Sequence, residues 1–122
     1  MNTDSQDSPK LSNLERSVLD AALSGNHQSL AILRNQVTVA QVASRTPSGV
    51  GFMTKLRLPR DVVLSPDRDM PTVPIVYAEH PQLPGGAEFL LQIKGGRINC
   101  IEAFCYEGMW PADDSLFRVR VG

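Results

Sequence analysis

Two adjacent glycines, Gly95 and Gly96, lie between two runs of alternating apolar and polar residues, and they constrain the fold more than any other feature. A two-residue turn between antiparallel strands needs a positive φ at both central positions, and glycine adopts it without steric strain. We therefore predict a β-hairpin over residues 87–106, in which Lys94 faces Arg97.

A regular register continued from this turn pairs Phe89 with Glu102. Successive side chains of a strand point to opposite faces of the sheet. The register therefore places Glu102 among apolar residues on one face: Phe89, Leu91, Ile93, Ile98, Cys100 and Phe104. An ionised carboxylate on a covered face is costly unless it is paired, so Glu102 is a candidate general acid or base. The alternative is that Glu102 lies where this face opens to solvent, paired with an arginine.

The N-terminal part has a helical period. Ser12 and Glu15 have the spacing of a capping box, and an apolar stripe follows at Leu14, Val18, Ala21 and Ala22. We expect the first helix to end at Gly25 in the left-handed conformation. Asn26 can cap a second helix, in which Leu30, Leu33 and Val37 repeat at helical spacing.

After Val37 the period changes from 3.6 to 2, which indicates strands. We expect strands near 37–44, 51–58, 75–78 and 116–121, with a proline-rich loop over 59–74 that contains a short strand at 61–64. The fold predicted is α+β, with an N-terminal helical hairpin packed on an antiparallel five- or six-stranded meander sheet. Residues 1–10 are expected to be a disordered arm, followed by a single domain over 11–122.

Composition excludes several classes of protein. The 122 residues include 12 basic and 13 acidic ones, a net charge of −1, and 42% are hydrophobic. This balance argues against disorder and against global attraction to nucleic acid or to a membrane surface. No run approaches the length of a membrane helix and the first residues lack a secretory signal, so we expect a cytoplasmic protein. The two cysteines and two histidines have no ligand spacing, and neither a metal nor a cofactor is expected.

The segment 102–114 is the candidate binding surface. It carries acidic residues and no basic one, and Tyr106 and Trp110 lie in a loop rich in glycine and proline. Exposed Tyr and Trp are typical anchors of protein interfaces, and acidic residues suit a basic partner. The candidate binding residues are Glu102, Tyr106, Glu107, Trp110, Asp113 and Asp114. The alternative is that the loop folds back and Trp110 covers one end of the core.

Four stretches of the chain together resemble a family of small bacterial proteins with no assigned activity. They are Ser44-Arg45-Thr46, Gly49-Val50-Gly51-Phe52, Gly86-Ala87-Glu88-Phe89-Leu90-Leu91, and Ile101-Glu102-Ala103-Phe104-Cys105-Tyr106 with Trp110-Pro111. The resemblance covers about residues 12–121. Members carry a glycine where this chain has Ala103. The resemblance implies a bacterial, cytosolic setting and assigns no catalytic residue.

These observations favour a non-enzymatic protein-binding domain, of which an immunity protein that neutralises a bacterial toxin is one version. A second hypothesis is a small enzyme or ligand-binding domain that uses Glu102 as acid or base. A third is a structural homodimer joined through its sheet edges.

Overall fold

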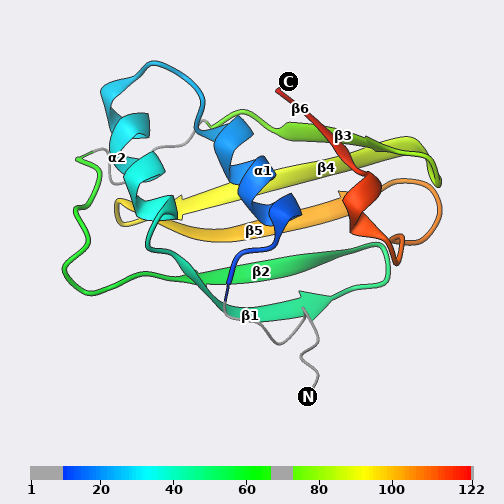
Figure 1. Cartoon of the computed structure of the whole chain (residues 1–122), viewed down its shortest axis with the longest axis horizontal. Helices are drawn as coiled ribbons and strands as arrows, with labels where there is room; N and C mark the ends of the chain where they lie inside the picture. Colours follow the sequence, from blue (N-terminus) through cyan, green and yellow to red (C-terminus); the bar gives the residue numbers. More distant parts are fainter. Residues whose placement is uncertain (1–9, 67–72, 122) are drawn as a thin grey trace.

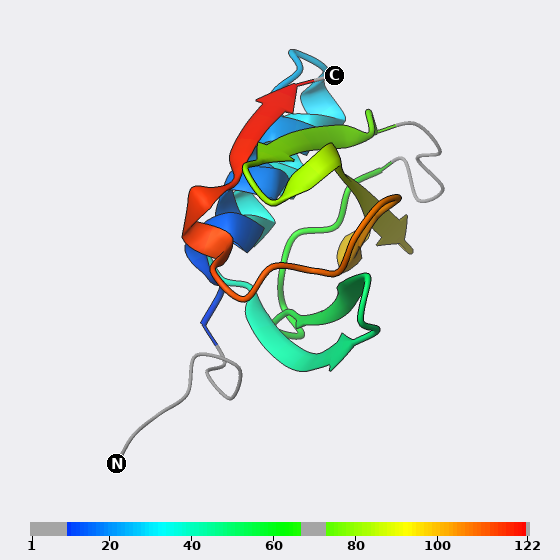
Figure 2. The ribbon, with the colours of Figure 1, turned by 90° about the vertical axis from the view of Figure 1, so that its right-hand side faces the viewer.

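The structure is a computed structural model that describes residues 10–66 and 73–121. Two helices precede all the strands and lie on one side of a curved sheet (Figures 1 and 2). The helices are α1 (Asn13–Ala22) and α2 (Gln28–Val37). The strands are β1 (Gln41–Pro47), β2 (Gly51–Arg57), β3 (Val76–His80), β4 (Leu83–Lys94), β5 (Arg97–Cys105) and β6 (Arg118–Val121), and a 3-10 turn, η2 (Asp114–Leu116), precedes the last strand.

The sheet has six strands in the order β1-β2-β5-β4-β3-β6, and all of its neighbouring pairs are antiparallel. The predicted α+β class, with N-terminal helices on an antiparallel sheet, is confirmed. Strands β3, β4 and β5 form a meander, whereas β2 pairs with β5 and β6 pairs with β3 across longer connections. The core lies between the helices and the sheet face that they cover, and Phe89, Leu19 and Ile101 are fully buried in it.

The capping box of α1 is confirmed, because Ser12 and Glu15 exchange side chain to backbone hydrogen bonds. Two expected helix ends are wrong. Helix α1 ends at Ala22, and Gly25 has no positive φ. The N-cap of α2 is His27, whose Nδ1 accepts the Ser29 N–H, and not Asn26.

The hairpin turn is confirmed, with φ of 61° at Gly95 and 78° at Gly96, but the predicted register is wrong beyond Ile98. A β-bulge at Asn99 inserts one residue, so Gln92 faces Cys100 and Leu90 faces Glu102. One extra residue moves every later side chain of the strand to the other face. Glu102 therefore lies exposed on the sheet face opposite the helices, and not among the core residues.

The strand expected at 61–64 is also absent from the structure, although these residues are described. The buried Gln36 side chain holds this segment instead. Its amide nitrogen donates to the carbonyl oxygens of Val63 and Gly96, and its amide oxygen accepts the Ile98 N–H. One side chain thus joins α2, the loop after β2 and the β4–β5 turn.

The arm predicted at residues 1–10 lies outside the described residues except for Lys10, whose carbonyl oxygen accepts a hydrogen bond from Arg45. In the part of the chain that the structure describes, no helix has the length and apolar character needed to cross a membrane.

Candidate functional site

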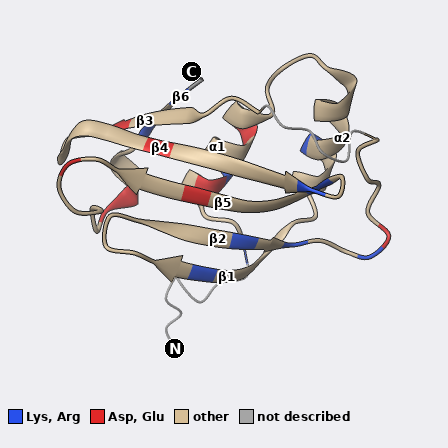
Figure 3. Cartoon of the chain, turned by 180° about the vertical axis from the view of Figure 1, so that it is seen from behind, with Lys and Arg blue, Asp and Glu red and all other residues tan. Residues whose placement is uncertain are grey.

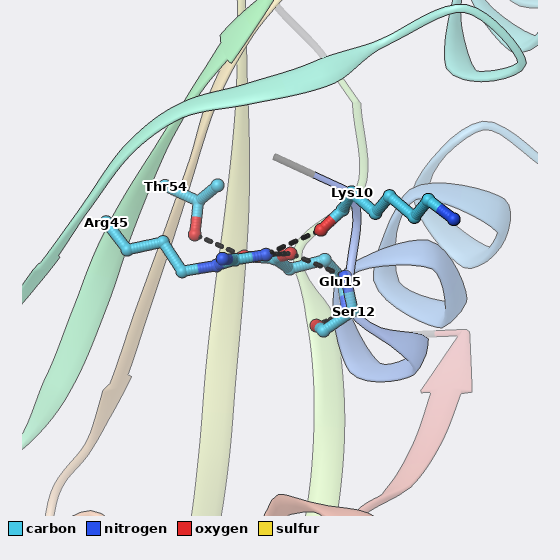
Figure 4. A network of polar contacts seen from close by, with 5 residues as sticks. All are labelled: Lys10, Ser12, Glu15, Arg45 and Thr54. Carbon is cyan, nitrogen blue, oxygen red and sulfur yellow. Dashed lines mark hydrogen bonds and ion pairs between the residues drawn. The ribbon is translucent and has the colours of Figure 1, made fainter. Parts of the chain in front are cut away.

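A buried carboxylate joins α1 to the β1–β2 hairpin (Figure 4). Glu15 accepts hydrogen bonds from Arg45 Nε and Nη2 at 3.0 and 2.8 Å, and from the Thr54 hydroxyl at 2.6 Å. It also accepts the Ser12 N–H of its own helix cap. The Glu15 side chain is 2% exposed and that of Arg45 is 14% exposed. Both carboxylate oxygens are occupied by donors of the protein itself, so this network is suited to holding the fold.

A β-bulge turns Arg45 towards Glu15. The pairing of β1 with β2 shifts between Val42 and Ser44, which leaves Ala43 as the extra residue. Val42 and Arg45 can therefore both face the helices although they are three residues apart. Arg45 lies opposite Thr54 in the register, which brings both donors to the same carboxylate.

The network also sets the charge state of the pair. Burial raises the pKa of Glu15, but the hydrogen bonds from Arg45, Ser12 and Thr54 outweigh it and hold the pKa below its ordinary value. The hydrogen bond to Glu15 is the main cause that raises the pKa of Arg45. Both groups are charged at neutral pH.

Trp110 packs at one end of the core. Its ring is stacked on Phe117 with centroids 4.9 Å apart, and it meets Phe52 and Phe89 edge to face at 5.4 and 5.9 Å. The backbone N–H of Trp110 donates to the Gly49 carbonyl oxygen, which ties the loop to the β1–β2 turn. Trp110 is half-buried and packs against the core. This is the position expected if the loop folds back on the core, and not that of an exposed anchor.

Asp113 and Asp114 lie in the turn that follows Trp110. Asp113 caps η2 through the Ser115 N–H, and its carbonyl oxygen accepts a hydrogen bond from Nε2 of the buried His80 at 2.8 Å. Asp114 lies near Arg45, and together with Glu15 and Trp110 these residues line a pocket of about 280 Å³.

The sheet face opposite the helices is the second candidate surface, and we call it the open face (Figure 3). Cross-strand neighbours share a face of an antiparallel sheet, so the register identifies the side chains on it. One row runs through Tyr77, Glu88 and Phe104, and the next through Leu90, Glu102 and Met53. Leu90, Met53 and Phe104 are half-buried on the open face, and Glu102 is exposed.

Tyr106 extends the first of these rows beyond the end of β5. The centroids of its ring and the Phe104 ring are 5.4 Å apart, and interaction of its hydroxyl with the Glu88 carboxylate raises the pKa of Tyr106. Tyr106 is 66% exposed and Tyr77 is 44% exposed. Two tyrosines therefore lie on either side of a half-buried carboxylate.

Four of the six candidate binding residues thus form two groups. Glu102 and Tyr106 belong to the open face, Trp110 and Asp114 line the pocket near Arg45, and Glu107 is exposed in the connecting loop. Asp113 is exposed next to the pocket.

Sequence reasoning missed Glu88 and Tyr77 as surface residues, and it missed the ion pair of Glu15 with Arg45. Along β3 and β4, buried and less buried residues alternate, so Tyr77 and Glu88 lie on the sheet face opposite that of their buried chain neighbours. This alternation is the signal that could have identified them as surface residues.

Among the described residues, no group of three or more His, Cys, Asp or Glu side chains is arranged to hold a metal ion. Cys100 and Cys105 are both buried, and both are free thiols. Comparison with models of protein families, with curated proteins and with solved structures found no match. The resemblance to small bacterial proteins therefore stays a prediction.

Proposed function

We propose that this chain is a non-enzymatic protein-binding domain and that the open face is its contact surface. One observation carries the proposal: within the described residues, helices cover one face of the sheet, and the other face is left with an apolar and aromatic centre. The side chains of this centre are Met53, Leu90, Phe104, Tyr77 and Tyr106.

Composition and charge support a protein partner. Aromatic residues and methionine are enriched where proteins meet, and tyrosines are frequent hot spots of binding energy. Glu88 and Glu102 lie within the centre, and Lys55 and Arg57 lie towards β1 on the same face. A partner that presents apolar side chains together with basic ones would complement the two carboxylates.

The two other hypotheses have less support. The acid or base role of Glu102 depended on a covered, low-dielectric position, and the side chain is exposed on a sheet face. Structural features of the two edge strands oppose edge-to-edge pairing of two copies. Strand β1 contains a bulge at Ala43 and an inward-facing charge at Arg45, and β6 is only four residues long with two arginines. Bulges, inward charges and short edge strands are devices that prevent pairing.

Photo-cross-linking tests the contact surface directly. A photoreactive phenylalanine derivative is placed at Tyr77 or Tyr106 on the open face, or at Ala31 on the exposed side of α2, and the protein is expressed in the cells from which it comes. We expect a defined cross-linked partner from the first two positions and none from Ala31. Cross-links from Ala31 alone would rule out the open face.

Affinity measured with the purified partner gives the second part of the test. Leu90→Lys introduces a charge at the centre of the open face without a core cavity, and we expect it to weaken binding about 30-fold. The matched control is Ala31→Lys, which adds the same charge on the helical side and should leave the affinity unchanged. Equal affinities of the two variants would contradict the proposal.

We infer that a toxin with a basic active surface is a partner of suitable chemistry, which would make the chain an immunity protein. The two carboxylates of the open face support this version, since they would cover basic groups that bind an acidic substrate. Co-expression with a toxin encoded next to this gene tests it. Wild-type protein should restore growth, and Leu90→Lys should fail to do so at equal expression.

A further inference from the structure

Glu88 has an unusual environment on the open face. It is half-buried in the middle of the sheet, and no ion-pair partner lies within 4 Å of it in the described ranges 10–66 and 73–121. The same cross-strand row contains Arg120, which lies opposite Tyr77. Arg120 is instead paired with Glu79 at 3.1 Å. No cation among the described residues is therefore paired with the Glu88 carboxylate.

Aromatic rings surround this carboxylate on two sides. Tyr77 is its register partner on β3 and Phe104 its partner on β5. Tyr106 lies edge to face with Phe104, and interaction of its hydroxyl with the Glu88 carboxylate raises the pKa of Tyr106. Both tyrosine rings are substantially exposed, so their faces are accessible from solvent.

We propose that the notch formed by Tyr77, Glu88 and Tyr106 is the subsite that receives an arginine side chain of the protein partner. A guanidinium group is planar, stacks on aromatic rings and pairs with a carboxylate through two parallel N–H donors. These are the two kinds of group that the notch presents side by side. The inference rests on the proposed function, because the arginine belongs to the protein that binds the open face.

Small probes test the subsite without the partner. N-acetyl-arginine methylamide is titrated into ¹⁵N-labelled protein, and the neutral isostere N-acetyl-citrulline methylamide is titrated in parallel. We expect saturable chemical-shift changes at residues 77, 88, 104 and 106 with the arginine probe, and binding about fivefold weaker or absent with citrulline. Equal shifts with both probes, or shifts spread evenly over all acidic residues, would overturn the inference.

Single substitutions distinguish the contribution of the Glu88 charge to probe binding from that of the Tyr106 ring. Glu88→Gln should weaken binding of the arginine probe about fivefold or more, whereas the control Glu102→Gln should not, because it removes a carboxylate from the same face without touching the notch. Tyr106→Ala should weaken binding, but Tyr106→Phe should bind at least as well as the wild type. The phenylalanine keeps the ring and removes the hydroxyl that competes for Glu88. A Tyr106→Phe variant as weak as Tyr106→Ala would contradict the stacking role.

The outcomes distinguish this inference from the proposed function. If Leu90→Lys abolishes partner binding while the arginine probe fails to bind, the open face remains the contact surface and the arginine subsite is wrong. If the probe binds in the notch but Leu90→Lys leaves the partner affinity unchanged, the proposed function fails and the notch stands as a separate site.

Discussion

The Glu15 carboxylate accepts four hydrogen bonds, and its position explains how α1 is fixed to the sheet. A buried ion pair contributes little net stability, but removing one partner leaves the other charge buried without compensation. We therefore expect Glu15→Gln to lower the free energy of unfolding by about 3 kcal/mol at neutral pH. Replacing the pair together, as Glu15→Leu with Arg45→Met, should cost less than the single change. Urea denaturation measures both, and a larger loss in the double variant would contradict this account.

The same carboxylate predicts a dependence of stability on pH. The pKa of Glu15 is lower in the folded protein than its ordinary value, so the folded state favours the ionised form. The stabilisation is complete above the ordinary pKa and is lost as the pH falls through the lower, folded pKa. The difference in unfolding free energy between wild type and Glu15→Gln should therefore shrink as the pH is lowered from about 7 to about 3. Denaturation curves across that range would disprove this if the difference grew.

Trp110 and Tyr106 are four residues apart but have opposite roles. Trp110 packs among three phenylalanine rings, while Tyr106 is 66% exposed. Trp110→Ala should lower the free energy of unfolding by about 3 kcal/mol, because a large half-buried ring leaves a cavity. Tyr106→Ala is the matched control and should cost less than about 1 kcal/mol. Thermal unfolding of both variants measures the contrast, and similar losses would show that Trp110 is not part of the core.

Among the elements, the β4–β5 turn depends on glycine at two positions for different reasons. Both have a positive φ, but a Cβ on Gly96 would lie 2.6 Å from the Ser65 carbonyl oxygen, whereas one on Gly95 would meet nothing within 4 Å. Gly96→Val should therefore lower the free energy of unfolding by about 2 kcal/mol or more. Gly95→Asn should change it by less than about 1 kcal/mol, because asparagine tolerates a left-handed backbone. A stable Gly96→Val protein in denaturant would contradict the close contact with Ser65.

Local signals predicted the elements but not all of their registers. The capping box at Ser12 and the turn at Gly95 depend on neighbouring residues, so the sequence contains all the information that they need. The sheet face on which Glu102 lies depends on one inserted residue, Asn99. The sequence marks this bulge by two adjacent apolar residues, Cys100 and Ile101, which are both buried in the structure.

The contacts of the candidate sites are long-range, which is why they could not be predicted. Glu15 meets Arg45 only because β1 bulges at Ala43 and faces α1. Glu88 lies beside Tyr77 only through the pairing of β3 with β4. No residue spacing in the sequence indicates either of these two contacts.

At the scale of the whole molecule, the sheet has two edges and one face that no helix of the described residues covers, and each bears on self-association. The edges are protected by the bulge and inward arginine of β1 and by the shortness of β6. Two open faces packed together about a twofold axis would bring Glu88 and Glu102 of one copy towards the same carboxylates of the other. Like charges brought together on desolvation oppose such an interface, whereas a basic partner would relieve the repulsion.

We therefore expect the isolated protein to be a monomer of 13.4 kDa, although a homo-oligomer was among the sequence-based expectations. Sedimentation equilibrium at about 10 to 100 μM, a range in which most specific homodimers persist, measures the mass directly. Glu88→Gln with Glu102→Gln removes the repulsion, and this variant should self-associate more than the wild type as the concentration rises. A wild-type dimer in this concentration range would contradict the expected monomer. An unchanged mass of the double variant would show that repulsion between these carboxylates does not keep the open faces apart.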